Sequence, residues 1–365
     1  MTTVAAAAAA CWLILLLLPW RLWSVREQLS ADETAAERDL SAITVLIPAR
    51  DEADTIATTV RAAASQGKNL RIIVIDDQSG DATAQLAAAA GAEVIAGQAL
   101  PQGWTGKLWA LQQGLEQVRS DYILQLDADI LLAPGMLTAL HEKIMRQQLT
   151  LVSIMALLPT TNLWQRVLLP AYVWFFKLLY PFALVNSTNR RFAAAAGGCI
   201  LLRRQALLDM GAYRALRGAI IDDCTLATAI KRQGGHIWLG LSRAVSSCRS
   251  SDSPAEIGKL ISRTAFTQLQ HSTLLLLLTS MAMLVLFWAP ILALLFATTG
   301  GKVIAALAIA CMLICYLPLL RFYRLAASYA LLLPLIAVFY LLHTWLSAIH
   351  HWRGRGAEWK QRHYP

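Results

Sequence analysis

The chain has 365 residues, of which 57% are hydrophobic and 15% charged, and its mean hydropathy is +0.49. This composition is too apolar for an ordinary soluble enzyme and favours a membrane protein. The net charge of +9 favours anionic lipid or substrate phosphate as a partner, and no basic run with interleaved aromatic residues indicates nucleic acid binding. The six cysteines form no CxxC pair, which argues against a zinc site or a disulfide framework and fits reduced cytoplasmic thiols.

The first apolar run covers residues 4–23 and is long enough to cross a bilayer. No basic segment precedes it and no clean cleavage site of small residues follows it, so we expect a retained signal anchor within residues 1–30. Arg21 and Arg26 follow the run, and the positive-inside rule then places the next segment in the cytoplasm.

Residues 31–271 are expected to form a globular cytoplasmic domain. Short runs rich in β-branched residues alternate there with amphipathic or Ala-rich segments, which predicts an α/β, Rossmann-like, mostly parallel sheet with helices on both faces. The expected strands are 43–47, 71–75, 92–96 and 121–126, and the expected helices lie near 53–66, 81–90 and 106–119.

Polar clusters follow three of these strands, at 48–52, at 76–79 and at Asp127-Ala128-Asp129. Ligands bind such sheets at the carboxyl ends of the strands. Residues i and i+2 of a strand project to one side, so the two aspartates would crowd one volume and repel each other unless a cation or a shared proton intervenes. Carboxylates without nearby Cys or His suit Mg²⁺ or Mn²⁺, and the alternative is a solvent-exposed turn that happens to hold two aspartates. A dinucleotide site is disfavoured because no GxGxxG follows the first strand.

The segment 163–186 is apolar but contains Arg166 and Lys177. We expect an interfacial helix with Trp164, Trp174 and Tyr180 at headgroup depth, and the alternative is a buried core helix. An interfacial helix would suggest an acceptor that is held in the bilayer.

Residues 272–350 are expected to form a C-terminal transmembrane region, followed by a basic tail at 351–365. Three crossings that start in the cytoplasm would leave this tail outside, whereas its arginines and lysine predict that it lies inside. Pro334 makes the last segment the candidate for a broken or re-entrant helix. The apolar segments lie near 274–299, 303–320 and 325–349.

The order of the motifs resembles the family-2 glycosyltransferases, which have a GT-A nucleotide-sugar-binding fold. The matching stretches are IPARDEADTI (47–56), VIDDQSGDAT (74–83), LDADI (126–130), AAGGCILLRR (195–204) and IDDCTLATAIKRQGG (221–235). A closer resemblance, to the hopene-associated glycosyltransferases and their ceramide and carotenoid relatives, comes from GWTGKLWAL (103–111), RTAFTQL (263–269) and WRGRGAEWKQRHY (352–364).

The resemblance implies roles for individual residues. Asp77 would accept a hydrogen bond from the uracil ring, Asp76 would close its turn, and Lys107 would contact the diphosphate. A lysine in the first turn of a helix opposes the helix dipole unless an anion is near. Gly197-Gly198 would let the backbone approach the sugar, although a strand bulge is an alternative. The expected nucleotide-sugar-binding residues are Pro48, Ala49, Arg50, Glu52, Asp77, Lys107, Asp127, Gly198, Asp222 and Arg263.

The resemblance also implies a divalent metal, Mg²⁺ or Mn²⁺, bound directly by Asp129, with Asp127 contacting the metal's water or the sugar. Asp223 would be the general base of an inverting transfer. The alternative for Asp222-Asp223 is a helix cap, and we expect Asp222 to cap and Asp223 to catalyse.

Processive members carry QxxRW after the base, whereas this chain retains only Arg263 of that pattern. The resulting expectation is a multi-pass protein of the cytoplasmic membrane that moves one sugar from a UDP-sugar to a lipid hydroxyl, with a hopanoid-like acceptor implied by resemblance. The alternatives are a polyprenyl-phosphate glycosyltransferase, a polysaccharide synthase and a non-catalytic membrane scaffold with a nucleotide-sugar fold.

Overall fold

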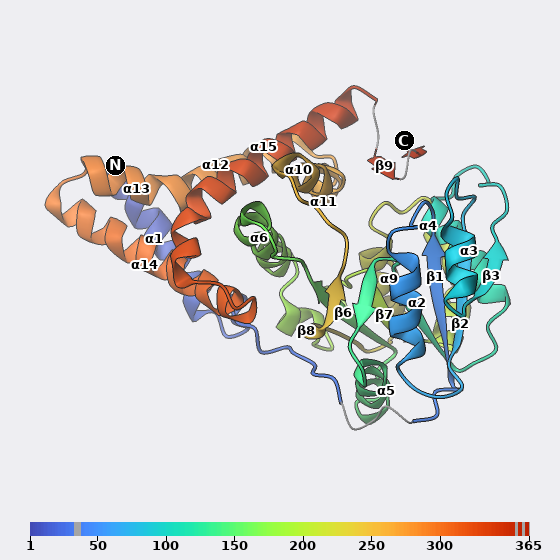
Figure 1. The fold of residues 1–365 in the computed structure, drawn as a ribbon. Coiled ribbons are helices and arrows are strands. Elements are labelled where there is room, and N and C mark those ends of the chain that lie inside the picture. Colours follow the sequence, from blue (N-terminus) through green and yellow to red (C-terminus); the bar gives the residue numbers. More distant parts are fainter. Residues whose placement is uncertain (33–37, 355–356, 360–361, 365) are drawn as a thin grey trace. The chain divides into compact units, whose positions relative to one another are not determined.

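The computed structural model describes residues 1–32, 38–354, 357–359 and 362–364. The chain divides into two compact units (Figure 1). We call them the sheet unit, which is Glu27–Pro159 with Leu184–Ser250, and the helical unit, which is Met1–Arg26, Thr160–Ala183 and Ser251–Pro365. Residues 160–183 and 251–271 group with the helices here, whereas the predicted domain boundaries place them in the cytoplasmic domain.

The sheet unit is built on an eight-stranded sheet in the order β3-β2-β1-β4-β7-β6-β8-β5. Four of its seven strand pairings are parallel, which confirms the mostly parallel α/β prediction. The strands are β1 (Ile43–Ala49), β2 (Arg71–Asp76), β3 (Glu93–Ala96), β4 (Tyr122–Leu126), β5 (Ile130–Leu132), β6 (Leu151–Leu157), β7 (Cys199–Arg203) and β8 (Ile237–Ser247).

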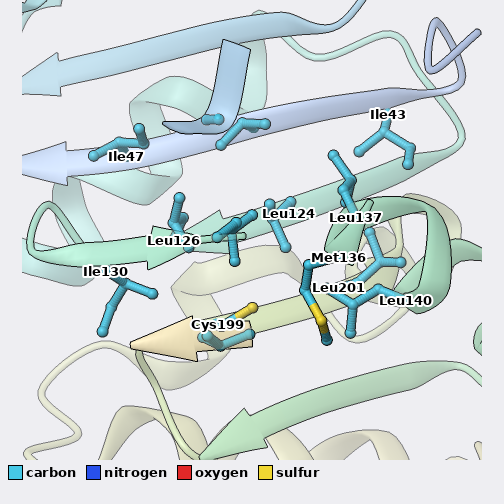
Figure 2. Packing of buried hydrophobic residues seen from close by; sticks show 14 of the residues in the cluster. Ile43, Ile47, Leu124, Leu126, Ile130, Met136, Leu137, Leu140, Cys199 and Leu201 are labelled. Atoms are coloured by element: carbon cyan, nitrogen blue, oxygen red, sulfur yellow. The ribbon is translucent and has the colours of Figure 1, made fainter. Parts of the chain in front are cut away.

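Alternation of side chains along β1 and its neighbours builds a core on each face of the sheet. Ile43 and Ile47 of β1 point to one face, together with Leu124 and Leu126 of β4, where they meet helix α5 (Figure 2). The opposite face is covered by α4. Gly114 permits the close approach of this helix, since a Cβ at that position would lie 2.7 Å from the side chain of Ile75. The helices of this unit are α2 (Ile56–Ala64), α3 (Thr83–Ala89), α4 (Gly106–Glu116), α5 (Met136–Arg146), α8 (Arg204–Asp209), the 3₁₀ helix η2 (Ala212–Leu216) and α9 (Asp222–Arg232).

The helical unit contains apolar helices from both ends of the chain. Figure 1 shows α1, α13 and α14 side by side. The elements are α1 (Thr2–Leu17), α6 (Leu163–Leu179), α10 (Pro254–Ser262), α11 (Ala265–Gln268), α12 (Thr273–Met283), the π-helix η3 (Leu284–Trp288), α13 (Ala289–Phe296), α14 (Thr299–Phe322), the 3₁₀ helix η4 (Ala327–Leu332), α15 (Leu333–Trp352), β9 (Ala357–Trp359) and β10 (Arg362–Tyr364), with α7 (Phe182–Val185) at the boundary of the two units.

Three helices of the described part are long and apolar enough to cross a membrane, and they match the three predicted segments: Thr273–Phe296, Thr299–Phe322 and Ala327–Trp352. Pro334 lies at the start of α15 and does not break it, because a helix leaves the first N–H groups without intrahelical partners in any case. The third segment changes from the 3₁₀ helix η4 to α15 at Leu333, next to Pro334, so a break there and the number of crossings both stay predictions. The first helix, α1, has 16 residues, fewer than the roughly 20 that a full crossing needs.

Trp174 of α6 is buried among the helices of the helical unit. Its side chain is 1% exposed, stacks on Trp12 and meets Phe287 and Tyr316 edge to face. The indole N–H donates to the carbonyl of Cys315, 3.2 Å away. Trp174 therefore packs among helices, as the alternative of a buried helix expects, and its depth in a membrane stays a prediction. Trp164, at the other end of α6, remains exposed.

Candidate active site

The loops that follow β1 and β2 are bound to each other. Arg50 donates to the carbonyl of Asp77 at 2.6 Å, and the Oδ1 of Asp51 accepts the N–H of Gly80 at 2.8 Å. The N–H of Glu52 donates to Thr83 at 2.8 Å. These hydrogen bonds fix the position of Glu52 in the loop after β1.

Asp127 and Asp129 follow β4 but bind different cations. Strand β4 ends at Leu126, so the alternation expected of a strand stops before the pair. Asp127 forms an ion pair with Lys107 at 2.6 Å, whereas Asp129 pairs with Arg249 at 2.7 Å. Each carboxylate thus has its own cation, and the charge of Asp129 still acts on Asp127, so their sharing of one small volume stays a prediction.

Lys107 lies in the first turn of α4 and is surrounded by acceptors. Besides Asp127, its ammonium lies 3.7 Å from Asp222 and 3.4 Å from the carbonyl of Gly197. The anions expected near this lysine are present, and they are side chains of the protein itself. Burial lowers the pKa of Lys107, but the charges of Asp127 and Asp222 outweigh that effect, and the net shift is upward.

Asp223, in the first turn of α9, is positioned by main-chain donors. Its Oδ1 accepts the N–H of Cys224 at 2.7 Å, and the N–H of Gly197 also stabilises the carboxylate. A Cβ on Gly197 would lie 3.1 Å from the Oδ2 of Asp223, so glycine permits this close approach. Asp223 accepts a helix N–H while Asp222 faces Lys107, so the structure does not show the expected cap by Asp222, and catalysis by Asp223 stays a prediction.

Two of the clustered aspartates have a raised pKa. Burial is the main cause that raises the pKa of Asp223 to about 6, with Asp222 adding to the effect and Lys107 opposing it. Burial also raises the pKa of Asp127, while Lys107 opposes the shift and Asp129 adds to it. A carboxyl with a pKa near 6 is suited to accept a proton at neutral pH.

Arg249 is the residue that the sequence analysis missed. It follows β8, and its guanidinium bridges Asp129 and Glu52, with both ion pairs at 2.7 Å. The available signal was an apolar run at 237–247 that ends beside a cation, but this run was not recognised as a strand. The cluster that we call the acidic edge thus comprises Glu52, Asp127, Asp129, Asp222 and Asp223 with the cations Lys107 and Arg249.

Other predicted residues occupy different surroundings. Pro48 and Ala49 are buried within β1, and Asp77 is buried beyond the end of β2. Gly198 accepts the N–H of Asp127 through its carbonyl. Arg263 follows α10 in the helical unit, so its contact with a diphosphate stays a prediction.

The donor set is chemically suited to a divalent metal, although among residues 1–32, 38–354, 357–359 and 362–364 no three His, Cys, Asp or Glu side chains are arranged as a metal site. Mg²⁺ and Mn²⁺ accept one or two carboxylates and take their remaining ligands from water and phosphate. Asp127 and Asp129 supply such carboxylates, and the cluster remains negative because its acidic groups outnumber its two cations.

Comparisons with known proteins show what the chain is similar to. Residues 44–211 match the family described as glycosyl transferase family 2. The chain is 32% identical over 111 residues to 4,4'-diaponeurosporenoate glycosyltransferase of Staphylococcus haemolyticus, and 33% identical over 100 residues to undecaprenyl-phosphate 4-deoxy-4-formamido-L-arabinose transferase of Shewanella sediminis. These matches cover 30% and 26% of the chain and 30% of each relative.

Among solved structures, a mannosyltransferase of Pyrobaculum calidifontis, in complex with GDP-mannose and Mn²⁺, has a similar fold. The TM-score is 0.54 at 16% identity, over 95% of this chain and 98% of that one. The fold of the chain is therefore the GT-A fold of glycosyltransferases. More particularly, residues 44–211, less than half of the chain, are similar to glycosyl transferase family 2.

Proposed function

We propose that this protein is a membrane-bound, inverting glycosyltransferase that moves one sugar from a UDP-sugar to a hydroxyl of a lipid. The observation that carries the proposal is the acidic edge, where carboxylates from three separate segments, two loops that follow strands and the first turn of α9, surround two cations. A non-catalytic scaffold has no use for such a cluster, since like charges held together reduce stability.

Asp223 is the proposed catalytic base. Its carboxylate takes the proton of the acceptor hydroxyl, and the acceptor oxygen bonds to the anomeric carbon as the bond from that carbon to UDP breaks. UDP leaves with the electron pair, and attack from the opposite side inverts the configuration. The raised pKa of Asp223 supports this role.

Asp127 and Asp129 are the proposed ligands of Mg²⁺ or Mn²⁺. When bound, such an ion neutralises the charge that develops on the leaving diphosphate. Lys107 holds Asp127 and Asp222 in place beside it. Glu52, the loop that contains Arg50, and Asp77 are the proposed border of the nucleotide.

The lipid acceptor is inferred from the apolar helices of the helical unit. Many of their leucines are exposed, which fits a surface embedded in lipid. The relative named for diaponeurosporenoate supports a lipid acceptor, and the resemblance of residues 103–111 and 263–269 favours a hopanoid-like one. The cytoplasmic membrane, with the sheet unit in the cytoplasm, is the proposed location.

A polyprenyl phosphate is the second candidate acceptor, and the relative named for undecaprenyl phosphate favours it. Such an acceptor brings its own ionised oxygen and does not require a base. Loss of Asp223 would then reduce turnover only slightly.

The test is transfer of labelled sugar into lipid by the detergent-purified protein. A panel of UDP-sugars and GDP-mannose is supplied with Mn²⁺ and either a hopanoid-containing lipid extract or undecaprenyl phosphate. Labelled glycolipid from a UDP-sugar and the extract is the expected result. Labelled product from undecaprenyl phosphate alone would favour the second candidate, and nucleotide binding without product from any pair would favour a scaffold.

A further inference from the structure

Arg249 and its two acidic partners differ in exposure. The arginine side chain is 47% exposed, whereas the side chains of Glu52 and Asp129 are each only 11% exposed. The guanidinium is therefore already partly hydrated and can turn into solvent, so the cost of breaking the two pairs falls on the carboxylates. The carboxylates are poorly solvated, and they need a positive partner whenever the arginine leaves.

The main chain around Arg249 does not depend on this ion pair. The N–H of Cys248 donates to the carbonyl of Asp129 at 2.8 Å, and the N–H of Arg249 donates to the Oγ of Ser247 at 3.2 Å. The end of β8 thus stays attached to the turn that contains Asp129. The side chain can swing while its anchor remains fixed.

We propose that Arg249 exchanges partners during donor binding, an inference that rests on the proposed function. In the donor-free protein it neutralises Asp129 and Glu52. When the divalent cation binds Asp129, the arginine breaks its ion pair with that carboxylate. It then pairs with the diphosphate of the nucleotide sugar. A planar guanidinium with two parallel N–H donors fits phosphate oxygens as well as carboxylate oxygens, so one side chain serves both states.

The exchange makes opposite predictions for two ligands. With Arg249→Gln, no cation competes for Asp129, and Mn²⁺ alone should bind about tenfold more tightly than to the wild-type protein. UDP, titrated at saturating Mn²⁺, should bind about tenfold more weakly because the diphosphate has lost a cation. Arg249→Lys keeps the positive charge but loses the two parallel N–H donors of the guanidinium. Its affinities for Mn²⁺ and UDP should lie between those of the wild type and Arg249→Gln.

The measurement is a pair of titrations on the full-length protein in detergent at fixed ionic strength: Mn²⁺ without nucleotide by electron paramagnetic resonance, then UDP by calorimetry. Arg243→Gln, which removes the same charge from an exposed position on β8, is the control and should change neither affinity. Thermal melting of each variant shows whether it is folded, and Mn²⁺ should raise the Tm of Arg249→Gln more than that of the wild type.

Three results would overturn the exchange while leaving the donor site in place. They are weaker binding of both ligands by Arg249→Gln, no change in either affinity, and tight UDP binding by the wild type without Mn²⁺ that Arg249→Gln abolishes. The last would make the arginine a permanent substitute for the metal. A wild-type protein that binds neither Mn²⁺ nor UDP nor GDP would instead overturn the donor site itself, and the exchange with it.

Discussion

Lys107 and Arg249 each lie between carboxylates at the acidic edge, but their surroundings differ. The side chain of Lys107 is 18% exposed and contacts Asp127, Asp222 and the carbonyl of Gly197. Arg249 is nearly half exposed and bridges only Glu52 and Asp129. The enclosed cation is a fixed part of the site, whereas the exposed one can be replaced by a ligand cation.

The two cations also mark two sides of the site with different proposed chemistry. The side with Lys107 includes Asp222 and Asp223, where the acceptor hydroxyl is proposed to lose its proton. The side with Arg249 includes Asp129, where metal and diphosphate are proposed to bind. Variants on the two sides should therefore separate the chemical step from donor binding.

Asp223→Asn should have the largest effect. We expect kcat to fall by about a thousandfold, because loss of a general base costs roughly 10² to 10⁴ in rate. UDP affinity should stay within about twofold, since the change affects the chemical step and not binding. Sugar transfer and UDP titration on one preparation measure both, with Asp209→Asn, an exposed aspartate of α8, as the control. A variant that retains most of the wild-type kcat would show that Asp223 is not the base.

The pH dependence of the wild type should show the second largest effect. The pKa of Asp223 is raised to about 6, so its base form is lost as the pH falls below that value. We expect kcat to drop about tenfold per pH unit on the acid side, and about a hundredfold near pH 4. Since the folded-state pKa exceeds the ordinary value, folding takes up a proton between roughly pH 4 and 6, and stability should decrease as the pH rises through this window. A profile that is flat down to pH 5 would contradict the assignment.

Lys107→Met should reduce stability by about 1–2 kcal/mol, less than for a fully buried pair because Asp127 is partly exposed. Denaturant unfolding measures this loss. Added Mn²⁺ should not restore it, since Lys107 also contacts Asp222 and the Gly197 carbonyl. The variant should also move the acid limb of the rate profile to higher pH, because the lysine lowers the pKa of Asp223. If Mn²⁺ fully restored the stability of Lys107→Met, Lys107 would be as replaceable by a ligand cation as Arg249 is proposed to be.

Gly197→Ala should have the smallest of these effects. The added Cβ would lie 3.1 Å from the Oδ2 of Asp223 and 3.3 Å from the ammonium of Lys107, so the carboxylate must shift by a few tenths of an ångström. We expect kcat to fall about tenfold with UDP affinity unchanged, since misplacement of a catalytic group affects the chemical step. Gly300→Ala, which has open space around it, is the control. A larger loss of UDP affinity than of kcat would place Gly197 on the donor side.

The sequence was sufficient to predict the first four strands and the helices between them. Runs such as 43–47 and 71–75 combine β-branched residues with nearby turn residues, and the carboxyl ends of parallel strands meet at one edge. The positions of Glu52 and Asp127 in that edge follow from the topology, whereas the role of Asp223 was implied only by the resemblance.

The partners of these carboxylates could not be predicted. Whether Asp127 and Asp129 face the same side depends on the residue at which β4 ends, and strand boundaries are weakly encoded in sequence. Arg249 is distant along the chain from Glu52. The strand that brings it to this edge, β8, was not recognised in the sequence. The burial of Trp174 was missed for a different reason, because an apolar helix presents the same pattern whether it packs against lipid or against other helices.

The most direct test of the account is the binding of UDP to the detergent-purified protein with and without Mn²⁺. Calorimetric titrations of the wild type, Asp129→Ala and Asp223→Asn provide it. The expected result is Mn²⁺-dependent binding that Asp129→Ala abolishes and Asp223→Asn retains. Binding that is indifferent to Mn²⁺ and to Asp129, or absent for both UDP and GDP in the folded wild type, would contradict the claim that the acidic edge is the donor site of a glycosyltransferase.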